Sequence, residues 1–399
     1  MDLDIILFII FCLALFIFFK IKRSKFEVQG KIVAIYKTKL GLNFMEKFSK
    51  FPKWLIHTLS VSSIIVGFGG MISIFWVLIQ GSFKLITVPD SLPVLAPVLP
   101  GISVPGLPKL SFLHWIISIF IVAVIHEFSH GIYSRFHNVK VQSSGFLILG
   151  PILGAFVEPD ENELKKKSVY KQLSIFAAGP FSNIVTGILF WLIAIIVINP
   201  LANGAIQYNG VQVASLDLNY PAVQAGLTIG DEIISIGNKQ INNVDDFIKI
   251  MNDKKPNDEI LIKTKNKEFN IKLAENPNNK NLGYLGIKVQ GVSASIKESV
   301  KAKYGDKLPW SLFWLSKLFF WLWLISIGIA LFNLLPLGPV DGGRMFLTGL
   351  SVFIKKEKNA KKVWGFVSFF ILALIVLNLL PFIKKLLVFI FSPILGLII

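Results

Sequence analysis

The sequence predicts a polytopic α-helical membrane protein with about six transmembrane helices and an inserted extracytosolic α+β domain. Of its 399 residues, 53% are hydrophobic and only 16% are charged, a balance typical of membrane proteins rather than of soluble enzymes. The apolar residues gather in runs that are long enough to cross a bilayer. Between residues 203 and 292 the runs become short and alternating, with frequent Asn, Asp and Lys, which indicates a separate soluble domain.

The net charge of +17 does not indicate a nucleic-acid partner, because many of the basic residues lie in short segments beside apolar runs. Ten Lys or Arg residues fall between Lys20 and Lys53. The positive-inside rule places that segment in the cytosol, in contact with anionic lipid, and the N-terminus outside. Cys12 is the single cysteine, so an intramolecular disulfide and a cysteine-based metal cluster are both excluded.

The pattern of apolar runs divides the chain into membrane and soluble regions. We expect membrane spans at 5–19, 55–80, 111–134, 173–199, 310–335 and 363–381. The expected regions are a signal-anchor span with a basic cytosolic segment (1–54), the first part of the membrane core (55–202), the soluble domain (203–292), the second part of the membrane core (293–354) and the C-terminal spans (355–399). Residues 386–399 are apolar but short, so they either span the membrane or lie against it as a hairpin.

The segments between the spans carry their own signals. Residues 29–41 predict a small strand pair, and residues 141–157 predict a hairpin tucked against the cytosolic side of the membrane. Residues 81–110 hold six prolines and few charges, which is typical of an extracytosolic loop. Residues 293–308 are polar and read as an amphipathic linker into the fifth span.

The strongest chemical signal is the HExxH motif at residues 126–130, inside the third expected span. Helical spacing puts His126 and His130 on one face, one turn apart, where two imidazoles can bind one Zn²⁺. Glu127 is then positioned as the general base for a water on the metal. The alternative is two core histidines with a paired glutamate. Three ionisable groups at ligand spacing in a membrane-length helix favour the metal, because such groups are costly in lipid.

A third ligand must come from elsewhere in the chain. After the fifth span, prolines and glycines break the helix, so we expect Asp341 on irregular backbone, or as the N-cap of a helix from Gly342 to Phe353. The loop charges bring Asp341 and the HExxH motif to the same, cytosolic side of the membrane. Two histidines and one aspartate leave a fourth position for water, as in catalytic zinc sites. A charged turn offers alternative ligands, for which a solvated surface is the simpler interpretation: Glu158, Glu161 and Glu163.

The fourth span begins with Gly179-Pro180 and reaches Asn183. A kink and an amide in the cytosolic third of a membrane helix would bring a polar side chain towards the site, although the same residues also suit helix packing. His137 follows the third span in a polar context, and we expect it at the surface.

The soluble domain predicts a short helix near residue 221, a strand from Glu232, a helix over Val244–Met251 and strands over Glu259–Thr264 and Glu268–Leu273. This order resembles a PDZ domain whose carboxylate-binding strand comes last. The loop that would hold a peptide C-terminus is formed by Tyr284, Leu285, Gly286 and Ile287. The alternative is a module that only gates access.

Three motifs together resemble the site-2 protease family of intramembrane zinc metalloproteases. They are HEFSH at 126–130, the Gly-Pro and Asn stretch at 179–183, and NLLPLGPVDGG at 333–343. The resemblance implies one Zn²⁺ per chain, held by His126, His130 and Asp341, with Glu127 as base. It also implies that Asn183 and Asn333 position the substrate. A span before the catalytic helix, one PDZ-like domain rather than two and further spans after Asp341 depart from some members.

The function expected on this basis is the hydrolysis of peptide bonds within or near transmembrane segments, in a multi-pass protein of the cell membrane. Its partners would be a single-pass membrane-protein substrate, the lipid bilayer and a peptide C-terminus at the PDZ-like domain. One alternative is a membrane zincin of another class that cuts soluble segments. Another is a non-enzymatic membrane PDZ scaffold with structural histidines.

Overall fold

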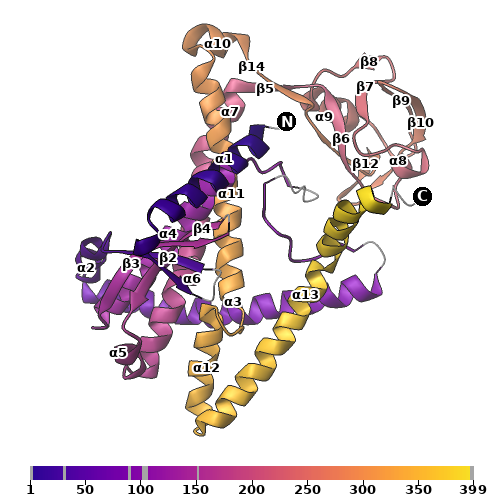
Figure 1. Cartoon of the computed structure of the whole chain (residues 1–399). Helices are drawn as coiled ribbons and strands as arrows, with labels where there is room; N and C mark the ends of the chain where they lie inside the picture. Colours follow the sequence, from indigo (N-terminus) through magenta and orange to yellow (C-terminus); the bar gives the residue numbers. More distant parts are fainter. Residues whose placement is uncertain (1–2, 30–32, 89–90, 101–106, 151, 396–399) are drawn as a thin grey trace. The chain divides into compact units, whose positions relative to one another are not determined.

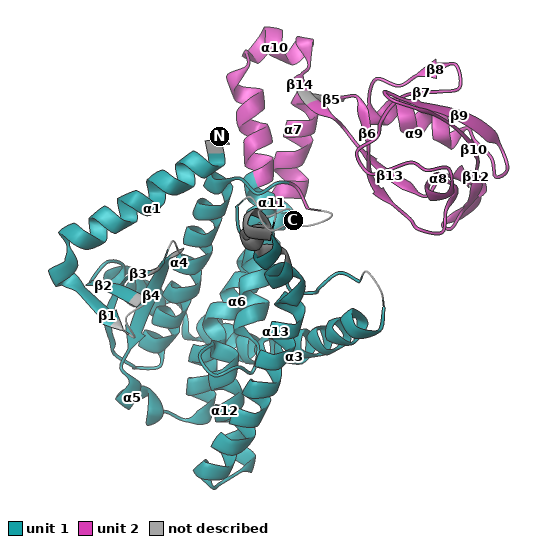
Figure 2. Cartoon of the chain, turned by 45° about the vertical axis from the view of Figure 1, so that its right-hand side comes forward, with its two compact units in different colours: residues 1–104, 109–192, 318–399 teal, residues 105–108, 193–317 magenta. Residues whose placement is uncertain are grey.

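The computed structural model describes residues 3–29, 33–88, 91–100, 107–150 and 152–395. The chain divides into two compact units, coloured separately in Figure 2. Unit 1 comprises residues 1–104, 109–192 and 318–399, and unit 2 comprises residues 105–108 and 193–317.

Within the described residues, six helical stretches have the length and apolar composition needed to cross a bilayer. They are Asp4–Ile21, Lys53–Thr87, Phe112–Phe136, Val169–Ala205, Lys307–Asn333 and Glu357–Lys384. The corresponding helices are α1 (Leu3–Ile21), α3 (Lys53–Thr87), α4 (Phe112–Phe136), α6 (Val169–Ile193) continued by a π-helix (Ala194–Ile198) and α7 (Asn199–Ala205), α11 (Lys307–Asn333) and α13 (Glu357–Leu395). They agree with the six expected spans, and nearly all extend further at their ends.

The alternative of a C-terminal hairpin is wrong for the part that the structure describes. Helix α13 continues without a break through residue 395, and only residues 396–399 lie outside the described range. The sequence interpretation ended the sixth span at Pro381, since proline removes a helix hydrogen bond. The apolar residues on both sides keep the helix going.

A four-stranded antiparallel sheet lies beside α4 and is built from two distant stretches (Figure 1). Its strands, in spatial order, are β1 (Phe26–Gln29), β2 (Val33–Thr38), β3 (Val141–Leu149) and β4 (Ile152–Pro159). The hairpin predicted at 141–157 is present, and the strand pair predicted at 29–41 lies a few residues earlier, at 26–38. Residues 30–32 and 151 lie outside the described residues. The union of the two pairs was not foreseen. Tyr36 lies opposite Phe146 across the β2–β3 pair. Neither stretch contains a sequence signal for pairing with the other.

Short helices surround this sheet and the helix ends. They are a 3₁₀ turn (Arg23–Lys25), α2 (Leu42–Ser49), α5 (Glu161–Lys165) and α12 (Asp341–Phe353). Small residues allow α6 to approach its neighbours closely, since Ala177 and Ala178 are fully buried beside Tyr133, Leu334 and Met345. This cluster joins α4, α6 and α12 around the predicted site.

Unit 2 holds a six-stranded sheet with the order β10-β9-β7-β6-β13, and β8 pairs with β7. Its elements are β6 (Val211–Leu216), α8 (Pro221–Gln224), β7 (Glu232–Ile236), β8 (Lys239–Gln240), α9 (Val244–Asn252), β9 (Glu259–Thr264), β10 (Glu268–Lys272) and β13 (Ile287–Gln290). The predicted strands and helices are all present. Their apolar faces form one core around Ile233 and Ile262.

The remaining elements of unit 2 are β11 (Ala274–Asn276), β12 (Asn279–Tyr284), β5 (Ile206–Asn209), β14 (Ser293–Ile296) and α10 (Glu298–Tyr304). Residues 293–308 are therefore more ordered than the expected linker. Strand β14 pairs with β5, with Ile296 opposite Ile206.

A buried amide fixes the proline-rich loop of unit 1. Asn378 on α13 donates to the Ser82 hydroxyl at 2.7 Å, and its amide oxygen accepts from the Val94 N–H at 3.1 Å. Val94 belongs to the described residues 91–100 of the predicted loop, whose residues 89–90 and 101–106 lie outside the described range. One side chain therefore ties that loop to α3 and α13.

We expect Asn378→Leu to destabilise unit 1 by about 1–3 kcal/mol, because it leaves the buried Ser82 hydroxyl and the Val94 N–H without their partner. The measurement is the thermal midpoint of the full-length protein in detergent. Asn359→Ala, an exposed change on the same helix, is the matched control. Equal midpoints for the two variants would contradict the role of this amide.

Candidate metal site

The HExxH motif lies in the middle of α4. The helix begins after Ser111, whose hydroxyl accepts from the His114 N–H, and its apolar run continues past the motif. His126 and His130 are both buried, and their rings meet edge to face at 4.8 Å between centroids. The predicted one-turn spacing therefore brings the two Nε2 atoms to 3.2 Å.

Asp341 reaches the same point from the other end of the chain. Its Oδ2 lies 3.0 Å from Nε2 of His126 and 3.2 Å from Nε2 of His130. Helix α12 begins at Asp341 itself, and Val340 is its N-cap. Asp341 is thus in the first helical turn, neither the N-cap nor on irregular backbone as expected. Gly342 and Gly343 allow this start, because a Cβ on either would collide with carbonyl groups of the preceding loop.

The three ligand atoms fit one metal ion. They lie within 4.8 Å of one another as a set, and Nε2 of His126, Nε2 of His130 and Oδ2 of Asp341 are 3.0–3.2 Å apart. Tetrahedral zinc with nitrogen and oxygen ligands at about 2.0–2.2 Å holds its ligands about 3.3 Å apart. The donors are also the types that zinc prefers, and each histidine offers Nε2 while Nδ1 faces another group.

Helix α6 supplies the groups that orient both imidazoles. Nδ1 of His130 donates to the Ile175 carbonyl at 2.7 Å, and Nδ1 of His126 lies 3.1 Å from the Asn183 amide. The atom of Asn183 placed against His126 is Nδ2. With Nε2 on a metal, Nδ1 of His126 carries the proton, so the amide has to be turned over to bring its oxygen there as the acceptor. One end of this fully buried amide has no hydrogen-bond partner among the described residues.

Gly179 lies directly over the metal ligands. A Cβ at this position would come within 2.4 Å of Nε2 of His130 and 2.6 Å of Nε2 of His126. Ile175, Gly179 and Asn183 follow one another at intervals of four, so they form one stripe on α6. Any side chain on the glycine would enter the space where the ion belongs.

Glu127 points to a different neighbour. Its Oε2 accepts from the Val157 N–H at 2.9 Å. Val157 belongs to β4, the outer strand of the sheet, so the carboxylate is held by a strand edge. The bond fixes the predicted base beside the metal ligands.

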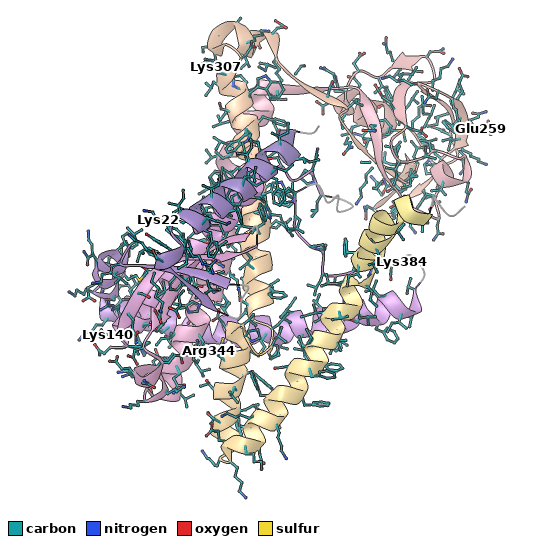
Figure 3. The ribbon with its side chains drawn as sticks, in the orientation of Figure 1. Lys22, Lys140, Glu259, Lys307, Arg344 and Lys384 are labelled. Atoms are coloured by element: carbon teal, nitrogen blue, oxygen red, sulfur yellow. The ribbon has the colours of Figure 1, made fainter. Side chains whose placement is uncertain are left out.

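The three alternative ligands have other partners. Glu158 accepts from Lys37 at 3.1 Å and from Ser143, Glu161 pairs with Arg344, and Glu163 accepts from the Lys140 N–H. The hydrogen bonds with Glu27 and Glu158 raise the pKa of Lys37. Arg344, labelled in Figure 3 near the start of α12, also stacks on Phe176 at 4.4 Å. None of the three glutamates joins the metal-binding group found among the described residues.

Two further predictions differ in outcome. His137 is buried, not at the surface, and its Nε2 lies 2.9 Å from the Ser174 hydroxyl. Burial lowers the pKa of His137 to about 4, with nearby Lys171 adding to the effect. The polar neighbours in sequence gave no sign that α6 would cover it. Asn333 donates to the Ile329 carbonyl of its own helix, and its role in substrate positioning stays a prediction.

The predicted peptide-binding loop of unit 2 has a defined conformation. Gly286 has φ +80°, and a Cβ there would collide with Tyr220. Leu285 is buried in the core, and the Tyr284 hydroxyl donates to Asp217 at 2.8 Å. The pKa of Tyr284 is raised to about 12, mainly by burial and to a lesser extent by this hydrogen bond. Ile287 begins β13, an outer strand of the sheet. Peptide binding by this loop stays a prediction.

Sequence reasoning did not identify three contributors to the site. Gly179 was interpreted as part of a kink or of helix packing, and the backbone groups of Ile175 and Val157 carry no side-chain signal. The spacing of four between Gly179 and Asn183 could have indicated that both face the same neighbour.

Comparisons with known proteins find one matching family and several relatives. The family model described as peptidase family M50 matches residues 114–377. An uncharacterized protein of Methanocaldococcus jannaschii is 30% identical over 368 residues, which cover 90% of this chain and 89% of that protein. A Clostridium perfringens protein named "Putative zinc metalloprotease CPE1693" is 25% identical over 297 residues, which cover 63% of this chain and 86% of that protein.

One similar solved structure is the PDZ domain of an SdrC-like protein from Listeria monocytogenes. It is 29% identical and covers 21% of this chain and 88% of that one, with a TM-score of 0.19.

We expect the full-length protein to purify with about one zinc ion per chain and Asp341→Ala to lose most of it, because one of three protein ligands is removed. The measurement is metal analysis in detergent without chelators, with the exposed change Asp253→Ala as control. Equal zinc in wild type and Asp341→Ala would mean that the third ligand lies elsewhere.

Gly179→Ala is expected to reduce zinc affinity at least tenfold by filling the space over the two Nε2 atoms. The same Cβ would press on the two buried imidazoles, and the stabilisation from bound zinc would be lost, so the unfolding temperature should fall together with the zinc affinity. Gly204→Ala, a helical glycine with open space around its Cβ position, is the control. Unchanged zinc binding in Gly179→Ala would refute the close approach.

Proposed function

The chain belongs to peptidase family M50, the site-2 protease family, and from that premise we propose an intramembrane zinc metalloprotease that hydrolyses peptide bonds within or near transmembrane segments. The observation that carries the proposal is the meeting of His126, His130 and Asp341 beside Glu127. His126 and His130 lie on a helix with the length and composition of a membrane span. A soluble enzyme has no need of that setting.

His126, His130 and Asp341 would hold the zinc ion through two nitrogens and one oxygen. When bound, zinc supplies a Lewis acid and lowers the pKa of water towards about 7. Ile175 and Asn183 fix the two imidazole rings, so that each keeps its proton on Nδ1 and its lone pair on Nε2.

Glu127 would act as general base and then as general acid. Its carboxylate takes a proton from the attacking water and later passes it to the leaving amine. The Val157 N–H donates to Oε2 of Glu127 at 2.9 Å. This hydrogen bond keeps the base oriented without another side chain.

The substrate would bind as an extended strand on β4. A transmembrane helix hides its carbonyl groups, so it must unwind before attack. Because the Val157 N–H points away from β3, strand alternation turns the backbone groups of Ala155 and Leu153 the same way. No other described strand pairs with that edge, and adding a strand there supplies hydrogen bonds for an unwound segment.

Asn183 supports substrate positioning. In the structure, Nδ2 of Asn183 lies 3.1 Å from Nδ1 of His126, and its Oδ1 is buried without a partner among the described residues. When the amide is turned over so that its oxygen accepts from His126, the NH₂ group takes that unpartnered position. An unpaired buried donor beside a metal site is suited to a substrate carbonyl or to the developing oxyanion.

The sidedness and the substrate class follow from the sequence argument. Basic loops assign the C-terminal end of α4 to the cytosol, and the PDZ-like domain to the outside. A single-pass membrane protein with helix-breaking residues in its span fits a site that needs an extended segment.

Glu127→Gln is expected to keep about one zinc ion per chain and to lose cleavage by at least a hundredfold, since general-base catalysis contributes about 10²–10⁴ in rate. The assay uses the full-length protein reconstituted with tagged single-pass substrates whose spans carry Gly-Pro, and follows the fragments on gels. Glu357→Gln, an exposed change on α13, is the control.

Near-wild-type turnover of Glu127→Gln would remove the assigned base. Cleavage of soluble segments only, with intact spans untouched, would favour a zincin of another class. Zinc-free wild-type protein would favour the scaffold alternative.

A further inference from the structure

Helix α2 lies at the periphery of unit 1 and packs directly on the metal-binding helix (Figure 1). It is a short helix between β2 and α3, and its Met45 is fully buried. A Cβ on Gly131 would come within 2.4 Å of the Met45 sulfur. Only a glycine next to His130 lets the two helices come this close.

The outer side of the same segment is aromatic and exposed. Trp54 is 71% exposed, Leu40 64%, Phe44 49% and Phe51 42%. Phe44 and Phe51 flank Phe48 in one row, with ring centroids 4.2 and 4.8 Å apart. Such a row of large apolar side chains is unfavourable in water and is typical of helices that lie in the membrane interface.

Four lysines and one glutamate accompany the aromatic row in residues 39–54. Lys39, Lys47 and Lys53 are exposed, and none of them forms an ion pair with another described residue. Lys50 pairs with Glu46, which also reaches Arg135 of α4. The unpaired charge on this surface is therefore positive.

The neighbours of this surface place it at the ends of two membrane-length helices. Residues 39–54 end where α3 begins at Lys53, and α2 contacts Gly131 and Arg135 in the last two turns of α4. One span begins and another ends at this level, which is where lipid headgroups meet the apolar interior.

We propose that residues 39–54 form a binding surface for anionic lipid headgroups, placed against the helix that carries the HExxH motif. Lys39, Lys47 and Lys53 bind the phosphates, while the aromatic row and Trp54 enter the acyl boundary. The proposal rests on the membrane location in the proposed function, and not on proteolysis.

The surface is firmly linked to the site elements. The Phe44 ring lies 5.8 Å from the Phe128 ring of the HExxH motif, and Gly41 lies under the Phe128 ring. The Leu40 carbonyl accepts from the Ser144 hydroxyl of β3. Lipid bound to this segment therefore stabilises both α4 and the sheet that holds Glu127.

The test is hydrogen exchange of the full-length protein in nanodiscs of phosphatidylcholine alone or mixed with phosphatidylglycerol. Exchange over residues 42–51 should slow in the mixed discs. In a variant with Lys39, Lys47 and Lys53 all changed to Gln, the preference for the mixed lipid should fall about fivefold per lysine. The same number of charges is removed in the control, which changes Lys249, Lys272 and Lys280 of unit 2 to Gln.

Equal exchange in the two lipids, or an equal lipid response in the triple variant and the wild type, would overturn the proposal. The experiment is repeated with Glu127→Gln, whose lipid response should match the wild type because binding needs no turnover. A lipid response in a protein that fails every cleavage assay would refute the proposed function and leave this surface standing.

Discussion

The structure depends on three ionisable side chains that satisfy one another in an apolar setting. Each of them alone would be costly at membrane depth. Together, Nε2 of His126, Nε2 of His130 and Oδ2 of Asp341 form one cluster at 3.0–3.2 Å. That cluster requires α4 and α12 to meet, although Asp341 lies far along the chain. The glycines after Asp341 and the small residues of α6 make the approach sterically possible.

Helix α6 shows how one stripe of a helix can serve two ligands. The Ile175 carbonyl accepts a hydrogen bond from one imidazole, Asn183 faces the other, and Gly179 leaves room between them. The three positions repeat every four residues, so a single rotation of the helix fixes all three. A stripe of this kind explains why a Gly-Pro sequence stands inside a buried helix, where glycine by itself is unfavourable.

The sequence predicted the parts of this site that have side-chain signals. His126, Glu127 and His130 follow from a spacing, and the loop charges placed Asp341 on the same side of the membrane as the HExxH motif. The sequence could not predict contacts made by backbone, such as the Val157 N–H on Glu127, because any residue could supply them. It also missed the burial of His137, since that depends on which helix covers it. The union of two hairpins into one sheet has the same cause, because pairing across distant segments leaves no local pattern.

Each face of helix α4 contacts a different neighbouring element. His126 and His130 face α6 and α12, Glu127 faces β4, and Phe128 and Gly131 face α2. Because α4 packs against neighbours on several sides, it has little freedom to move. The edge of β4 is therefore the part that can adapt to a substrate. The proposed substrate strand on β4 would share that edge with Glu127. Pairing can extend over Leu153 and Ala155, but at Val157 it must stop or displace the carboxylate from its N–H donor. The reach of the bound strand and the position of the base are therefore linked through one backbone group.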